Sequence, residues 1–119
     1  MAEDDVLDPA VVDGLRAAEE DLANPMLIRG LVGLFLTRTP GKLDRTRQAL
    51  AAGDAATARE MAHSLRSNCG IVGATGMAAA CGRLEDAAAR ADIPAAAAAF
   101  ADVESQLPAV VSALSALTQ

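Results

Sequence analysis

The sequence is short of aromatic side chains: its 119 residues include two phenylalanines, no tryptophan and no tyrosine. It also lacks any run in which β-branched and polar residues alternate, the pattern that predicts a half-buried strand. Hydrophobic residues still make up 52% of the chain, and the commonest of them is alanine, the strongest helix former. We therefore expect an all-α fold with one core, in a single domain that spans residues 1–119. Within it, residues 1–6 are expected to form a mobile acidic tail.

Positive charge is scarce as well. Ten lysines and arginines face sixteen aspartates and glutamates, which gives a net charge of −6 at pH 7. This balance argues against a nucleic-acid partner, which requires a basic patch, and against an anionic membrane surface. No apolar run approaches the ~20 residues that span a bilayer. The start of the chain, MAEDDVLD, lacks the basic and apolar regions of a signal peptide, so we expect a cytoplasmic protein.

Metal-binding side chains are few. The chain has one histidine, His63, and two cysteines, Cys69 and Cys81. In the cytoplasm both thiols are expected to stay reduced, as small buried residues. The cysteines form no C-x-x-C or C-x-x-C-H motif, and one histidine cannot complete a common zinc set with them. A metal- or haem-binding bundle is therefore disfavoured, and we expect no metal and no cofactor.

Proline and glycine mark the expected ends of the helices. Asp8 and Pro9 predict a cap and first turn for a short amphipathic helix that reaches about Leu22. The apolar side of this helix carries Val11, Val12 and Leu15. On the residues alone, these three side chains simply cover part of the apolar core.

The pair Asn24-Pro25 repeats the cap signal and is followed by a strongly apolar stretch, which we expect to be buried on much of its surface. That stretch consists of Leu27, Ile28, Leu31, Val32, Leu34, Phe35 and Leu36. Pro40 interrupts the pattern, because proline removes a helical hydrogen bond. Residues 25–52 therefore form either one kinked helix or two helices with a break near Pro40.

Two further helices are expected after the one that carries the histidine. The turn at residues 73–76 leads into a helix whose inner stripe comprises Met77, Cys81, Leu84 and Ala88. Pro94 lies near the start of the last helix, which Pro108 should bend. Its apolar residues follow spacings of three and four: Phe100, Val103, Leu107, Val110, Leu114 and Leu117.

The helix expected over residues 55–72 has two contrasting faces. One stripe is small or polar and comprises Ala56, Arg59, Glu60, His63, Arg66, Ser67 and Gly70. The opposite stripe is apolar and comprises Ala58, Met61, Leu65, Cys69 and Val72. Such a helix buries the second face and exposes His63 to water.

An exposed imidazole beside a guanidinium suits phosphoryl chemistry. A neutral imidazole has one nitrogen free to act as a nucleophile when the other holds the proton. Arg66, three residues after His63, could pair with the phosphoryl group that results. Glu85 on the next helix could accept the Nδ1 proton of the ring and leave Nε2 as the reactive atom.

The pattern A-H-S-L-R-S, then I-V-G-A, then C-G-R-L-E resembles the histidine-containing phosphotransfer (HPt) domain of bacterial phosphorelays. The resemblance covers nearly the whole chain. It implies an up-and-down four-helix bundle with a short N-terminal helix capping one end. It also implies that His63 relays a phosphoryl group between receiver-domain aspartates, which partner proteins must supply. Mg²⁺ is then expected only in the partner receiver domain, and the chain is expected to act as a monomeric carrier, not an enzyme.

The same resemblance assigns individual residues. Arg66 stands where the family has a lysine that stabilises phosphate, and Glu85 stands where the family often has a side chain bonded to the histidine. Ser67 replaces a family glycine, and it could either crowd the partner or donate a hydrogen bond to the phosphoryl group. The candidate partner-binding residues are Val11, Val12, Leu15, Arg59, Glu60, Ser67 and Gly70.

An alternative function remains open on the sequence. A helical adaptor with a similar bundle could bind a signalling protein without being phosphorylated. Replacement of His63 by glutamine separates the two hypotheses, because it abolishes a relay but leaves an adaptor nearly intact.

Overall fold

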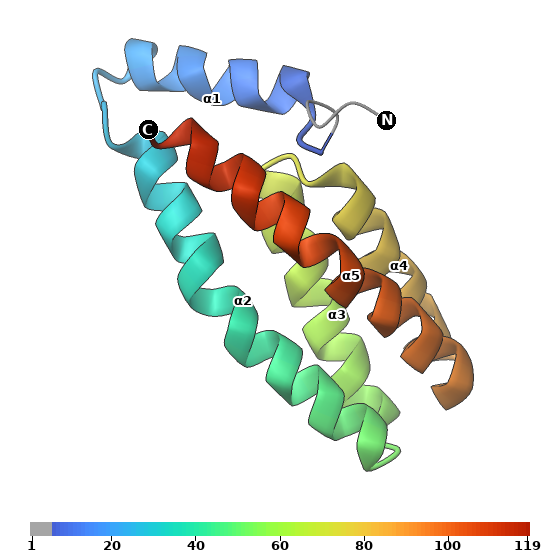
Figure 1. Cartoon of the computed structure of the whole chain (residues 1–119). Coiled ribbons are helices and arrows are strands. Elements are labelled where there is room, and N and C mark those ends of the chain that lie inside the picture. Colours follow the sequence, from blue (N-terminus) through green and yellow to red (C-terminus); the bar gives the residue numbers. More distant parts are fainter. Residues whose placement is uncertain (1–5) are drawn as a thin grey trace.

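The computed structural model describes residues 6–119, which form five helices and no strand. The helices are α1 (Pro9–Asp21), α2 (Leu27–Ala51), α3 (Ala55–Ile71), α4 (Thr75–Ala89) and α5 (Ile93–Leu117). Helices α2 to α5 run alternately up and down, and α1 lies across the end of the bundle where α2 begins and α5 ends (Figure 1). The prediction of an all-α bundle with a short N-terminal helix at one end is confirmed.

Helix α1 begins as the sequence predicts, since the Asp8 carboxylate accepts a hydrogen bond from the Ala10 amide at 2.9 Å. The Asp8 amide in turn donates to the carbonyl of Gly73 at 2.8 Å, which ties the start of α1 to the α3–α4 turn. Gly73 has a φ of +78°, and a Cβ atom there would lie 3.0 Å from the Cβ of Val11. Glycine is therefore required at this turn for its backbone conformation and for the close approach of α1.

The predicted boundary of the N-terminal tail is wrong at Val6. This residue is half-buried and packs against the main core, so it belongs to the folded domain. The remaining five residues of the predicted tail, 1–5, lie outside the described residues.

Helix α2 begins two residues later than the Asn24-Pro25 signal suggests. The Asn24 side chain accepts a hydrogen bond from the Met26 amide at 3.1 Å, within the turn that precedes the helix. The first turn of α2 is completed by Glu19 of α1, whose carboxylate accepts from the Ile28 amide at 3.0 Å. A side chain that is distant in sequence thus does part of the capping, which no local pattern predicts.

Helix α2 continues through Pro40, whose side chain is exposed, so the single-helix alternative is correct. The expected burial of its apolar stretch is right for Ile28, Val32 and Phe35, which are almost fully buried. It is wrong for Leu34 and Leu36, which remain 46% and 37% exposed. Helix α2 packs against α3 and α5, but these neighbours leave a large part of both side chains uncovered.

The core lies between α2, α3, α4 and α5 and contains many alanines, whose small side chains let helices approach closely. The inner stripe predicted for α4 is buried throughout. On α3 the prediction holds except at Met61, which is only half-buried. In α5 the predicted apolar stripe faces the core, with Leu107 and Leu117 half-buried, and the helix is unbroken at Pro108.

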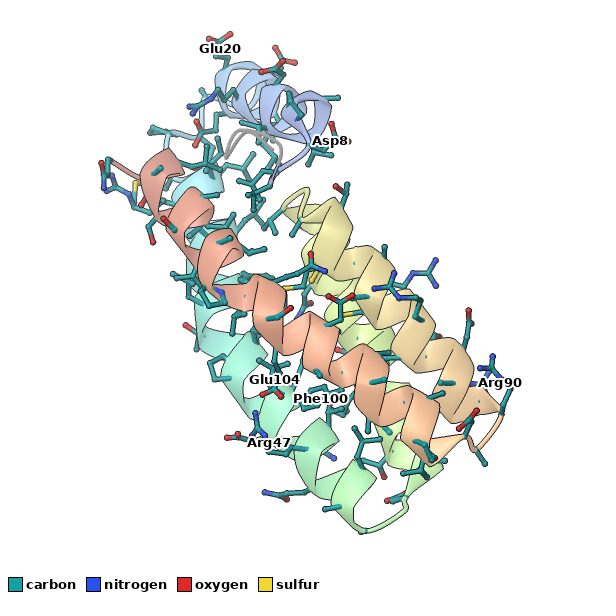
Figure 2. The ribbon with its side chains drawn as sticks, turned by 45° about the vertical axis from the view of Figure 1, so that its right-hand side comes forward. Asp8, Glu20, Arg47, Arg90, Phe100 and Glu104 are labelled. Carbon is teal, nitrogen blue, oxygen red and sulfur yellow. The ribbon has the colours of Figure 1, made fainter. Side chains whose placement is uncertain are left out.

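A cation also bridges α2 and α5 on the surface of the bundle. Arg47 of α2 pairs with Asp44 at 2.6 Å and with Glu104 of α5 at 2.5 Å. Its guanidinium lies 5.7 Å from the centre of the Phe100 ring. Figure 2 shows Arg47 beside Phe100 and Glu104 along this pair of helices. The cluster helps to hold α5 against α2.

Candidate functional site

The site is built on the exposed face of α3. All seven residues of the predicted polar stripe are exposed, and the side chain of His63 is 71% exposed. His63 lies near the middle of α3, where the helical backbone is fully hydrogen-bonded and holds the ring in a defined position. A partner can therefore reach the imidazole without any opening of the bundle.

Glu85 of α4 defines the tautomer of the ring. Its Oε2 atom lies 3.0 Å from His63 Nδ1. An ionised carboxylate can only accept a hydrogen bond, so Nδ1 carries the proton in this contact. In the neutral ring, Nε2 then holds the free lone pair, on a side chain that is largely exposed.

The second oxygen of Glu85 contacts Arg66. The Arg66 Nη1 atom donates to Glu85 Oε1 at 3.3 Å, and the Glu85 side chain is only 18% exposed. Burial acts to raise the pKa of Glu85, but the hydrogen bonds from His63 and Arg66 outweigh it and lower the pKa overall. Glu85 is therefore an anion at neutral pH, as the contact with Nδ1 requires.

Arg66 crosses from α3 to α4 over a glycine. A Cβ atom on Gly82 would lie 3.8 Å from the Arg66 Cζ atom, so the guanidinium rests against α4 at this point. An added methyl group would fit, whereas a larger side chain would push the guanidinium away. Sequence reasoning did not single out Gly82, although it lies within the C-G-R-L-E motif, three residues before Glu85.

The candidate partner-binding residues fall into two groups. Arg59, Glu60, Ser67 and Gly70 share the exposed face of α3 with His63. The other three lie on α1, where they are half-buried: Val11, Val12 and Leu15. Val12 and Leu15 pack against the core, and Val11 lies against the turn at Gly73. The role of both groups in partner binding stays a prediction.

Cys69 and Cys81 lie beneath the site, where α3 meets α4, and both are free and fully buried. A hydrogen bond with Cys69, together with burial, raises the pKa of the Cys81 thiol. The expectation that they are small buried residues is confirmed.

The described part of the fold also bears on metal binding and on membrane crossing. Among residues 6–119, no three side chains of histidine, cysteine, aspartate or glutamate come together in a group that could hold a metal ion. Within the same residues, no helix has both the length and the apolarity needed to cross a membrane. A cavity of about 480 Å³ lies between the start of α1 and the end of α5, and none of the residues around it belongs to the His63 cluster.

Comparison with known proteins gives a consistent picture. A family model described as "Hpt domain" matches residues 30–117. The solved structure of histidine-containing phosphotransfer protein B from Pseudomonas aeruginosa PAO1 is 28% identical in sequence. It superposes with a TM-score of 0.82 over 92% of this chain and 91% of that one. Histidine-containing phosphotransfer protein ZmHP2 from maize is 20% identical, with a TM-score of 0.75 over 100% of this chain and 91% of that one, a likeness of fold. A comparison with curated protein sequences finds no match.

Proposed function

The chain belongs to the Hpt domain family and functions in phosphorelay, and we propose that His63 is the residue that carries the phosphoryl group. The observation that carries this proposal is the 3.0 Å contact between His63 Nδ1 and Glu85 Oε2 on an otherwise exposed ring. In the neutral ring this contact places the proton on Nδ1 and the free lone pair on Nε2, on a side chain that a partner can reach.

In the proposed transfer, the Nε2 lone pair attacks the phosphorus of an aspartyl phosphate on a receiver domain. The new bond joins Nε2 to phosphorus, and the bond from phosphorus to the aspartate oxygen breaks, so that the aspartate leaves as a carboxylate. The proton on Nδ1 stays in place. The phosphorylated ring therefore gains positive charge, which the Glu85 carboxylate stabilises at 3.0 Å. The reverse sequence passes the group to a second receiver.

Arg66 is proposed to hold the transferred group. A phosphoryl group on histidine carries about two negative charges near neutral pH, by analogy with other phosphorylated side chains. Arg66 is 58% exposed, and its contact with Glu85 is long at 3.3 Å, so its guanidinium can turn towards the new anion. Its planar fork matches two phosphoryl oxygens. Ser67 lies one turn beyond His63 on the same face, where it either donates to the same oxygens or narrows the approach.

The proposed partners are receiver domains of response regulators or hybrid kinases. In this scheme the receiver supplies the Mg²⁺ and the main catalytic groups, and this chain supplies a positioned nucleophile. Proteins of the family are carriers of the group rather than catalysts, and we extend this to the present chain. A cytoplasmic location, a monomeric state and the absence of a bound cofactor remain predictions of the proposal.

The proposal is tested by transfer of labelled phosphate from phosphorylated receiver domains to the protein and to its His63→Gln variant. We expect acid-labile, base-stable label on the wild type and none on the variant. Binding of receivers without any label on the wild type would contradict the relay and support the adaptor.

A further inference from the structure

Gly82 lies at the midpoint of α4, where its backbone conformation gives no reason for glycine. It is the eighth of the 15 residues in the range Thr75–Ala89. It is not among the glycines with a positive φ, which are Gly53 and Gly73. A glycine in the interior of a helix is destabilising relative to alanine. What distinguishes this position is the space that a side chain would fill.

That space is occupied by the guanidinium of Arg66. The three atoms nearest to a Cβ atom placed on Gly82 are Arg66 Nε and Cζ, both at 3.8 Å, and Arg66 Nη1 at 4.0 Å. These are ordinary van der Waals distances, so a methyl group fits, but a longer side chain would enter the place of the guanidinium. The absence of a side chain at Gly82 therefore makes room for Arg66. At five other helical glycines a Cβ atom would have no such neighbour within 4 Å: Gly14, Gly30, Gly33, Gly41 and Gly70.

The register of α3 against α4 brings the two residues together. Arg66 lies one turn after His63 on α3. Gly82 lies one turn before Glu85 on α4, which runs antiparallel to α3 (Figure 1). The contact of His63 with Glu85 at 3.0 Å therefore places Arg66 opposite Gly82. From there Arg66 Nη1 reaches Glu85 Oε1 at 3.3 Å, the oxygen that does not contact the imidazole.

We propose that Gly82 is a positioning residue for phosphoryl transfer, because only a very small residue at this place lets Arg66 contact Glu85. The inference rests on the proposed function, which assigns the phosphoryl group to His63 and Arg66. Arg66 is 58% exposed, so a guanidinium displaced from α4 would move into solvent. Glu85 would lose the contact at Oε1, and the phosphoryl group would lose a cation that is held close to it. A longer side chain at Gly82 should therefore act like the loss of Arg66.

The test compares Gly82→Leu with Gly82→Ala and with a Gly33→Leu control. Gly33 is the matched residue, because it is exposed in the interior of α2 and a Cβ atom there would have no neighbour within 4 Å. Arg66→Ala and the Gly82→Leu/Arg66→Ala double variant complete the set. Each protein is phosphorylated by phosphoramidate, a small donor that needs no docking. The rate of phosphorylation and the lifetime of phosphorylated His63 are measured.

We expect Gly82→Leu to reproduce the change in rate or lifetime caused by Arg66→Ala, which is about three- to tenfold. Gly82→Ala and Gly33→Leu should keep the wild-type values. The double variant should equal Arg66→Ala, because a residue that acts through Arg66 has no effect without it. A wild-type rate and lifetime in Gly82→Leu would overturn the proposal. Effects that multiply in the double variant, or an equal change in Gly33→Leu, would overturn it as well.

A second measurement needs no phosphate. Burial raises the pKa of Glu85, and the contacts with His63 and Arg66 lower it. The pKa of Glu85 should therefore be higher in Gly82→Leu than in the wild type and unchanged in Gly82→Ala and Gly33→Leu. NMR titration of the Glu85 carboxyl carbon measures it, and a mere loss of stability would not move it. An unchanged pKa in Gly82→Leu would contradict the proposal.

Two further checks separate the possible causes of failure. Circular dichroism verifies that each variant is folded, and Gly82→Met repeats the test with another good helix former. Failure of the proposed function looks different from failure of this inference. In that case wild-type His63 would take no phosphate from phosphoramidate, although the pKa of Glu85 would still rise in Gly82→Leu.

Discussion

Two clusters of arginine and carboxylate side chains join different pairs of helices in this bundle. Arg47 connects α2 to α5 through Asp44 and Glu104 and lies over the Phe100 ring (Figure 2). Arg66 connects α3 to α4 through Glu85. The Arg47 contacts are the shorter, at 2.6 and 2.5 Å against 3.3 Å. Strength of pairing therefore does not identify the functional site.

The Arg47 and Glu85 clusters differ in whether a polar atom is left free to react. Each carboxylate around Arg47 faces a permanent cation, and no further chemistry follows from that contact. Glu85 divides its two oxygens between Arg66 and a histidine whose Nε2 atom is left free, and its arginine is held loosely enough to turn to an incoming anion. We infer that the Arg47 cluster supports the fold and that the Glu85 cluster supports transfer, and four predictions test this contrast.

The largest effect is expected for His63→Gln. Loss of the imidazole removes the only nucleophile of the site, so phosphorylation by phosphoramidate or by a receiver should fall by about a thousandfold or more. The unfolding free energy should change by no more than about 0.5 kcal/mol, because the side chain is 71% exposed. Mass spectrometry under alkaline conditions and urea unfolding measure the two effects. Label that persists in the variant would move the phosphoacceptor elsewhere.

A smaller but still large effect is expected for Glu85→Ala, with Glu104→Ala as its counterpart in the other cluster. Removal of a carboxylate that orients a histidine typically costs ten- to a hundredfold, by analogy with the outer partners of metal-bound histidines. We therefore expect His63 phosphorylation to slow by about that factor in Glu85→Ala and to keep its wild-type rate in Glu104→Ala. Initial rates with phosphoramidate measure this. Equal rates in the two variants would remove the distinction between the clusters.

The two arginines are expected to differ in a similar way. Arg66→Ala should shorten the lifetime of phosphorylated His63 or slow its formation, by about three- to tenfold, because a charge-assisted contact with the phosphoryl group is lost. Arg47→Ala should leave both quantities unchanged and lower the melting temperature slightly, since it removes exposed ion pairs and a contact with Phe100. Decay of label and thermal melts distinguish these outcomes. A shorter lifetime in Arg47→Ala would contradict the assignment.

The smallest effect concerns pH. The pKa of Glu85 is lowered in the folded protein, so its carboxylate contributes stability that is fully present above the ordinary value of 4.5. That contribution is lost as pH falls below 4.5 and through the lowered pKa, where the carboxylate takes up a proton. The difference in unfolding free energy between wild type and Glu85→Gln should therefore shrink as the pH falls below 4.5. Urea unfolding at several pH values below 5 measures it, and a difference that grows as the pH falls through this range would contradict the lowered pKa.

The sequence predicted much of this site because the residues concerned follow local periodicity. A stripe of seven residues on α3 is exposed as its spacing indicates, and Asp8 caps α1 as its type and position indicate. Glu85 lies 22 residues from His63, and only the turn near Gly73 and the resemblance to the HPt pattern suggested that the two side chains meet. No such pattern connects Glu19 with the start of α2. The sequence therefore did not predict that the Glu19 carboxylate accepts a hydrogen bond from the Ile28 amide.

By itself, the amino-acid sequence determined the helical class, the approximate helix ends and the face of α3 on which His63 lies. These features depend on backbone propensity, capping and a 3.6-residue period, which act within a few residues of one another. Only the tertiary structure decided that Leu34, Leu36 and Ile71 stay exposed. It also decided that Met61 is half-buried and that Arg66 rests against Gly82. These outcomes depend on where neighbouring helices lie, because a side chain is buried only when another element covers it.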